Sequence, residues 1–110
     1  MTRISTSNKY GAVRTWSYMF ERWFASGHEA NRAHELGLLQ YAGDITELQF
    51  QPKFTLDESK PKMTYSADFK YYDLKTDKWV YEDAKGQDTR ASKVSRRWVK
   101  QKYGIEVKLV

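Results

Sequence analysis

The chain has 110 residues, of which 40% are hydrophobic and 30% charged, and it carries a formal net charge of +5 at pH 7. These values fit one folded domain rather than a disordered chain. No apolar run approaches the roughly 20 residues that span a bilayer, and the N-terminus lacks the apolar core of a signal peptide. The absence of cysteine excludes disulfides and thiolate metal sites, so we expect a cytoplasmic protein.

Positive charge is concentrated in residues 85–108, and a second basic group lies near the N-terminus. This distribution favours a polyanionic partner, with nucleic acid as the first candidate, although a basic surface can also serve only solubility. Residues 1–9 are predicted to form a mobile basic arm, and residues 10–110 a single domain.

The first clear element is a helix over residues 27–41. Ser26 and Glu29 fit a capping box, and Gly43 supplies the end of the helix. Apolar residues recur along one face: Ala30, Ala33, Leu36 and Leu38 or Leu39. The aromatic-rich segment before it, residues 10–24, is compatible with a helix or with strands, and favours core or subunit contacts over base stacking.

Three strands follow the helix. Alternation of apolar and polar residues predicts a strand over residues 47–56, and Pro52 requires a sheet edge or a bulge there because it cannot donate a ladder hydrogen bond. Strands over residues 63–74 and 79–85 come next, and the short connection between them suggests a hairpin.

A second helix is predicted over residues 90–103, capped by Asp88 or Thr89 and ended by Gly104. Its inner face is predicted to consist of Ala91, Val94 and Trp98. Its outer face carries four basic residues, which either are only solvated or contact a phosphate backbone: Lys93, Arg96, Arg97 and Lys100. A last strand over residues 105–110 is expected to be parallel to its neighbour, so the fold class is α/β, a mixed four-stranded sheet flanked by helices.

Two carboxylates and a lysine are predicted to meet on the hairpin. Alternate residues of a strand share a face, so Asp83 and Lys85 lie on the same side. A turn centred between Thr76 and Asp77 would place Asp68 opposite Lys85. Asp83 would then lie diagonally beside Asp68, whereas a one-residue bulge would turn Asp68 to the other face.

Such a set of groups suits a divalent cation. Oxygen ligands favour Mg²⁺ or Mn²⁺, which can activate a water and stabilise charge on a phosphodiester. Lys85 would orient that water or neutralise the developing charge. An aspartate and a lysine two residues apart on a strand are also commonly no more than a solvated pair.

The chain resembles the PD-(D/E)xK nuclease superfamily, which has an acidic residue on the second strand and Asp-x-Lys on the third. More closely, four segments look like a small phage and prophage family of unknown function grouped with phage endonuclease I-type Holliday junction resolvases. These segments are Phe24-x-Ser26-x-x-Glu29-Ala30-x-Arg32, Leu48-Gln49-x-Gln51-Pro52-Lys53-Phe54-x-Leu56, Tyr65-x-Ala67-Asp68-Phe69 and Glu82-Asp83-x-Lys85-Gly86-x-x-Thr89. Ala67 stands where the superfamily name has proline.

The resemblance implies a restriction-endonuclease-like αβββαβ core and a metal-dependent, structure-selective DNA endonuclease. It implies that Asp68, Asp83 and Glu29 hold Mg²⁺ (or Mn²⁺) and that Lys85 is the catalytic lysine. Gln51 and Gln87 are weaker candidates for contacts within the site. Branched DNA would be held by the outer face of the second helix, and a homodimer in the bacterial host cytoplasm would make two related cuts. The alternatives are a nucleic-acid-binding module that keeps the fold without cleaving, and a structural phage protein whose basic face contacts an acidic protein.

Overall fold

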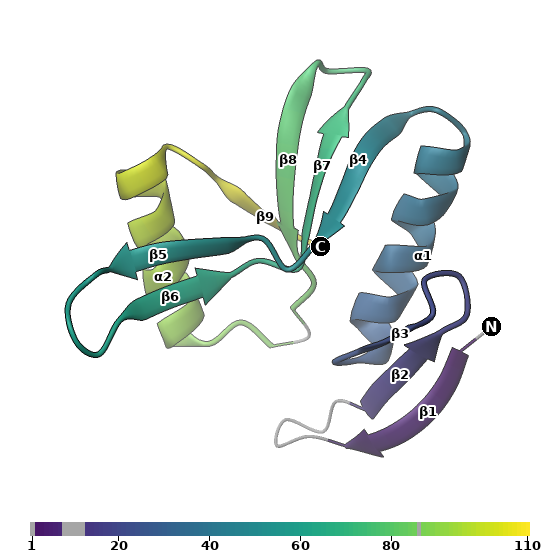
Figure 1. Ribbon diagram of the computed structural model, residues 1–110, viewed down its shortest axis with the longest axis horizontal. Coiled ribbons are helices and arrows are strands. Elements are labelled where there is room, and N and C mark those ends of the chain that lie inside the picture. The colour runs from purple at the N-terminus through teal and green to yellow at the C-terminus, as the bar shows by residue number, and fades with distance from the viewer. Residues whose placement is uncertain (1, 8–12, 86) are drawn as a thin grey trace.

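The computed structural model describes residues 2–7, 13–85 and 87–110 (Figure 1). The elements in chain order are β1 (Thr2–Ser7), β2 (Val13–Ser17), β3 (Arg22–Phe24), α1 (Gly27–Tyr41), β4 (Ile45–Phe50), β5 (Lys53–Asp57), β6 (Met63–Ser66), β7 (Phe69–Asp73), β8 (Lys78–Asp83), α2 (Arg90–Tyr103) and β9 (Val107–Leu109). In this part of the chain, no helix is both long and apolar enough to cross a bilayer.

The central sheet has four strands in the order β4-β7-β8-β9. Its first two pairings are antiparallel, and β8 pairs with β9 in parallel after the crossover through α2. The mixed four-stranded α/β sheet flanked by helices is therefore confirmed, and so is the parallel last strand. The helices and this sheet follow one another as αβββαβ once the β5–β6 hairpin is set aside.

Each helix covers its own hydrophobic core. The first core joins α1 to β7, and its buried members are Phe24, Ala30, Ala33, Leu36, Ile45, Phe69, Tyr71 and Ala84. The second joins α2 to the β5–β6 hairpin and β9, and its buried members are Phe54, Leu56, Tyr65, Ala67, Val99 and Val107. Figure 1 shows α1 and α2 on opposite sides of the central strands, with β5 and β6 lying across α2. Strand β8 runs between the two cores, so alternate side chains of β8 face different helices.

Two predicted strands are each broken in the structure, and this corrects the prediction. Residues 47–56 divide at Gln51 and Pro52 into β4 and β5, and residues 63–74 divide at Ala67 and Asp68 into β6 and β7. The two breaks are hydrogen-bonded to each other, because Gln51 N–H donates to Asp68 O (3.0 Å) and Ala67 N–H donates to Pro52 O (3.0 Å). Strand β5 follows the first break and β6 precedes the second. These two strands pair with each other as a separate hairpin.

The segment before α1 forms a small sheet of its own, in the order β1-β2-β3. Residues 13–24, left open between helix and strand by the sequence, contain two of these strands. Residues 2–7 of the predicted arm form the third, while residues 1 and 8–12 lie outside the described part. Gly37 lets this sheet approach α1, because a Cβ at that position would overlap Met19 and lie 2.9 Å from Phe20 Cζ.

The two helices begin and end as predicted. Ser26 caps α1, with its Oγ accepting from Glu29 N–H (3.1 Å), and Thr89 caps α2 through Ser92 N–H (3.1 Å). Gly104 closes α2 in the left-handed conformation (φ 69°), which a residue without Cβ adopts freely. The predicted inner face of α2 is wrong in part: Ala91 and Val94 are exposed, and Val99 is the buried residue.

Candidate active site

The β7–β8 hairpin is paired two residues away from the predicted register. The prediction placed Asp68 opposite Lys85, which is wrong. The ladder instead pairs Phe69 with Glu82. Asp68, the residue before β7, therefore comes level with Asp83, and its N–H donates to the Glu82 carbonyl (2.9 Å). The two aspartates are therefore neighbours along the backbone, but Asp83 faces the α2 side of the sheet, whereas the Asp68 carboxylate lies beside Glu29 of α1.

Asp68 lies at the break between β6 and β7, where its carboxylate is fixed from two directions. Its Oδ2 accepts from Ala84 N–H (2.8 Å), and its Oδ1 accepts from Gln51 Nε2 (3.3 Å). Gln51 has a left-handed backbone (φ 58°), a conformation that costs a side-chain-bearing residue about 1–2 kcal/mol. The strained turn between β4 and β5 thus presents a side-chain amide to Asp68.

Glu29 approaches Asp68 from the first turn of α1. The predicted capping box is half formed, because Ser26 accepts from Glu29 N–H while the Glu29 carboxyl lies beside Asp68. Burial, and next the negative charge of Asp68, raise the pKa of Glu29 to about 8. The Glu29 carboxyl therefore holds its proton to a higher pH than an exposed carboxyl does.

Asp83, at the end of β8, faces the α2 side of the sheet and is fully buried. Its Oδ2 accepts from the Tyr65 hydroxyl and lies 4.0 Å from Lys85 Nζ. Within the described part of the chain its Oδ1 has no hydrogen-bond partner. Burial raises the pKa of Asp83 to about 6, and the positive charges of Lys85 and then Arg96 limit the rise.

The predicted acidic residues thus form a row rather than a ring. Glu29 lies beside Asp68, whose N–H donates to the carbonyl of Glu82, and the next residue, Asp83, contacts Lys85 through its carboxylate. As they lie, the described residues contain no group of three His, Cys, Asp or Glu side chains close enough to hold a metal ion. Two features nevertheless fit a cation: the buried, unpartnered Asp83 Oδ1 and the Glu29 carboxyl that lies beside Asp68. The donors are all oxygens, the ligands that Mg²⁺ and Mn²⁺ prefer.

A buried ion pair beside this row was missed by the sequence prediction. Glu82, which is fully buried on the α1 face of β8, accepts from Arg32 Nε (2.8 Å) and Nη2 (2.7 Å). The Tyr71 hydroxyl donates to the same carboxylate. The pKa of Arg32 is raised by Glu82, and that of Tyr71 by burial and by Glu82. A signal was present, because Glu82 lies between Val80 and Ala84 on an otherwise apolar face, where a charge requires a partner.

The basic face predicted on α2 is only partly present. Lys93, Arg97 and Lys100 are exposed, and Lys100 Nζ lies 3.7 Å from Glu106. Arg96 does not belong to this face: its side chain is only 14% exposed and is paired through both terminal nitrogens with Asp88 (2.9 and 2.7 Å). Its positive charge lies near enough to lower the pKa of the Asp83 carboxyl, so Arg96 belongs to the surroundings of the acidic row. No described contact joins Gln87 to that row.

The fold and the row define a small α/β protein with buried carboxyl groups at one end of a mixed sheet. The family described as "Protein of unknown function (DUF1064)" matches residues 7–110, and the chain belongs to this family. Among curated proteins and among solved structures, nothing matches the chain.

Proposed function

We propose that this protein is a metal-dependent endonuclease that hydrolyses phosphodiester bonds in branched DNA. One observation carries the proposal: the carboxylate of the fully buried Asp83 has an unpartnered oxygen and lies 4.0 Å from Lys85 Nζ. Buried carboxylates normally have partners, and carboxyl groups whose pKa is shifted by burial and by neighbouring charges are concentrated at functional sites. The resemblance of these residues to the Asp…Asp-x-Lys pattern of PD-(D/E)xK nucleases supplies the reaction class.

In this proposal each side chain has a separate task. Asp68 and Asp83 supply oxygens for a Mg²⁺ or Mn²⁺ ion, which when bound would act as a Lewis acid on water and phosphate. Lys85, held beside Asp83, neutralises negative charge that develops on the phosphate. Glu29 gives up its proton when positive charge is placed beside Asp68, because an opposite charge favours the ionised form of a carboxyl.

The charge of the molecule supports DNA as the substrate. The net charge is +5, and Lys93, Arg97 and Lys100 project from α2 into solvent. Phosphate contacts of this kind position a protein on DNA without reading its sequence. A branch cut symmetrically on two strands requires two active sites, and a homodimer would supply them.

The test is incubation of the protein with a four-way DNA junction, a flap and a linear duplex, each with and without Mg²⁺. We expect nicks in the junction only with metal. Asp83→Asn, which keeps the shape of the side chain, should cut at least about 100-fold more slowly, a loss of roughly 2.7 kcal/mol in transition-state stabilisation. The matched control is Asp57→Asn, at the end of β5, which should cut at the parent rate. If Asp83→Asn also cuts at the parent rate, the assignment is wrong.

One observation favours a second function, a nucleic-acid-binding module that does not cleave. The described residues contain no ready group of three metal-ligating side chains. A module of this kind would bind junction DNA in EDTA and leave every substrate intact with any divalent metal. Cleavage by the parent protein, lost in Asp83→Asn, rejects it.

A further inference from the structure

Strand β8 carries a second surface, at the end opposite Asp83. Trp79 is 44% exposed, and it lies directly across the β7–β8 ladder from Tyr72, with ring centroids 5.2 Å apart. The Lys70 ammonium lies 4.6 Å from the centre of the Trp79 ring and 5.5 Å from that of Tyr81. Aromatic faces and a cation thus lie together on the open part of the sheet.

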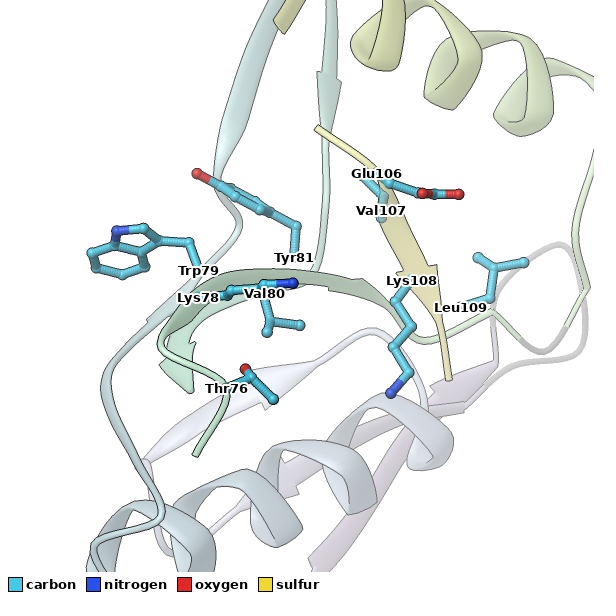
Figure 2. A pocket seen from close by; sticks show the side chains of 9 residues that line it. All are labelled: Thr76, Lys78, Trp79, Val80, Tyr81, Glu106, Val107, Lys108 and Leu109. Carbon is cyan, nitrogen blue, oxygen red and sulfur yellow. The ribbon is translucent and has the colours of Figure 1, made fainter. Parts of the chain in front are cut away.

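This surface borders a groove of about 560 Å³ along the β8–β9 edge. The groove exists because β9 pairs with β8 only from Tyr81 onward, so the first half of β8 has no neighbour on that side. Figure 2 shows Trp79 and Tyr81 on one side of β8, with Val80 and Lys108 on the other. The groove therefore wraps around an uncovered sheet edge.

Three lysines at the groove have no carboxylate partner in the part of the chain that the structure describes. Lys78 and Lys108 line it, Lys70 borders it, and within the described residues none of the three forms an ion pair. The one acidic residue that lines the groove, Glu106, lies 3.7 Å from Lys100. A second copy of the chain seated here would bring like charges together, which disfavours self-association through this surface. A polyanion would satisfy the lysines.

We propose that this surface, defined by Lys70, Tyr72, Lys78, Trp79, Tyr81 and Lys108, binds an unpaired nucleic-acid strand, with a base stacked on Trp79 and phosphates beside the lysines. Base–aromatic stacking beside a basic groove is the general way in which proteins hold single strands. Bases inside a duplex are already stacked on one another and cannot offer a face to Trp79. The surface therefore selects unpaired nucleotides.

The inference rests on the proposed function, which it deepens by naming the part of the DNA that the protein recognises. Trp79 and Asp83 share one face of β8 and are four residues apart, which is roughly 13 Å along a strand. That distance matches about four nucleotides at the 3.4 Å rise of a stacked strand. The protein would hold the unpaired strand of a branch about four nucleotides from the bond that it cuts.

The experiment measures binding in EDTA, so that it does not depend on cleavage. Parent and variants are titrated into a fluorescein-labelled single strand of about 12 nucleotides, within the size range that single-strand sites cover, and into a duplex of equal length. Trp79→Ala should weaken single-strand binding about 5- to 150-fold, the range that corresponds to loss of one stacked base, and should leave duplex binding within about twofold. Trp79→Phe, which keeps a ring, should lose much less.

Two controls separate this surface from charge and exposure in general. Tyr41→Ala removes an exposed ring on α1, and Lys62→Ala removes a lysine between β5 and β6. Neither should change the preference for the single strand, whereas Lys70→Ala should reduce it. In case Trp79→Ala does not fold, quenching of tryptophan fluorescence by the single strand should be smaller in Trp79→Phe than in the parent.

Three results would overturn the inference. These are unchanged single-strand affinity of Trp79→Ala, equal losses for single strand and duplex, or a dimer in the parent that Trp79→Ala dissociates while DNA affinity stays unchanged. Failure of the proposed function gives a different result: no substrate is cut, yet single-strand binding still depends on Trp79. Cleavage of junctions combined with unchanged binding by Trp79→Ala rejects the inference alone.

Discussion

Glu82 and Asp83 are consecutive residues of β8, both fully buried, and they face opposite helices. On the α1 side, the Glu82 carboxylate has the Arg32 guanidinium and the Tyr71 hydroxyl as partners. On the α2 side, the Asp83 carboxylate has Tyr65 and a lysine 4.0 Å away, and one of its oxygens has no partner in the described part of the chain. Among the described residues, the fold therefore supplies partners for both oxygens of Glu82 but for only one oxygen of Asp83.

The pairing of Glu82 also positions the acidic row. Arg32 and Glu29 are three residues apart on α1, on neighbouring positions of one helix face. Binding Arg32 to β8 therefore helps to hold Glu29 against Asp68.

The largest effect is expected from breaking the satisfied side. Arg32→Ala leaves Glu82 buried without its cation and should lower the free energy of unfolding by about 3–5 kcal/mol, measured by urea denaturation. Arg97→Ala, which removes an exposed arginine, should change it by less than about 0.5 kcal/mol. Arg32→Met combined with Glu82→Leu should recover part of the loss, with Tyr71 still lacking its acceptor. Equal stability of Arg32→Ala and the parent would show that the ion pair does not hold α1.

The next largest effect is the pH dependence of stability that Asp83 produces. Because the pKa of Asp83 rises from 3.8 unfolded to about 6 folded, its stabilising contribution is complete below pH 3.8 and is lost as the pH rises through 6. Two pKa units correspond to roughly 3 kcal/mol. Asp83→Asn should make the fall between pH 4 and 6 less steep, while the fall that Glu29 produces from about pH 4.5 to pH 8 should remain. Parallel pH profiles of unfolding free energy for parent and variant would contradict the prediction.

A bound cation should supply the partner that the Asp83 carboxylate lacks among the described residues and the Glu82 carboxylate already has. At a Mg²⁺ concentration 100 times its dissociation constant, binding to the folded protein alone would add about 2.7 kcal/mol of stability. We expect Mg²⁺ to raise the melting temperature of the parent at pH 8 and to have little effect on Asp68→Asn or Asp83→Asn. The control Asp57→Asn should respond as the parent does. An equal response in all four proteins would indicate nonspecific binding.

The sequence predicts the features that depend on nearby residues and misses those that depend on residues far apart in the chain. The bounds of α1 follow from Ser26 and Gly43, which act within one turn, and they were confirmed. The strand breaks depend on hydrogen bonds between Gln51 and Asp68, 17 residues apart, which no local pattern shows. The hairpin register was missed because Asp73 Oδ1 accepts from Lys75 N–H (2.9 Å), which shifts the turn toward the N-terminus.

The candidate site shows the same division. Asp68, Asp83 and Lys85 were recognisable by type and spacing, but whether each oxygen has a partner depends on side chains from other elements. Tyr65 reaches Asp83 from β6, and Arg32 reaches Glu82 from α1. A sequence pattern can therefore nominate the carboxylates without revealing which one the fold satisfies.

The smallest expected effect tests the strained residue that supports the row. Gln51 adopts φ 58° and donates to Asp68 Oδ1 over 3.3 Å, a long hydrogen bond at the exposed rim of the site. Gln51→Gly relieves the strain and should raise the free energy of unfolding by about 0.5–1 kcal/mol, whereas Gln51→Ala keeps the strain and should not. If the amide orients Asp68, both variants should weaken the Mg²⁺-dependent rise in melting temperature by the same amount despite their different stabilities. A Mg²⁺ response equal to that of the parent in both variants would mean that Gln51 serves only the chain reversal between β4 and β5.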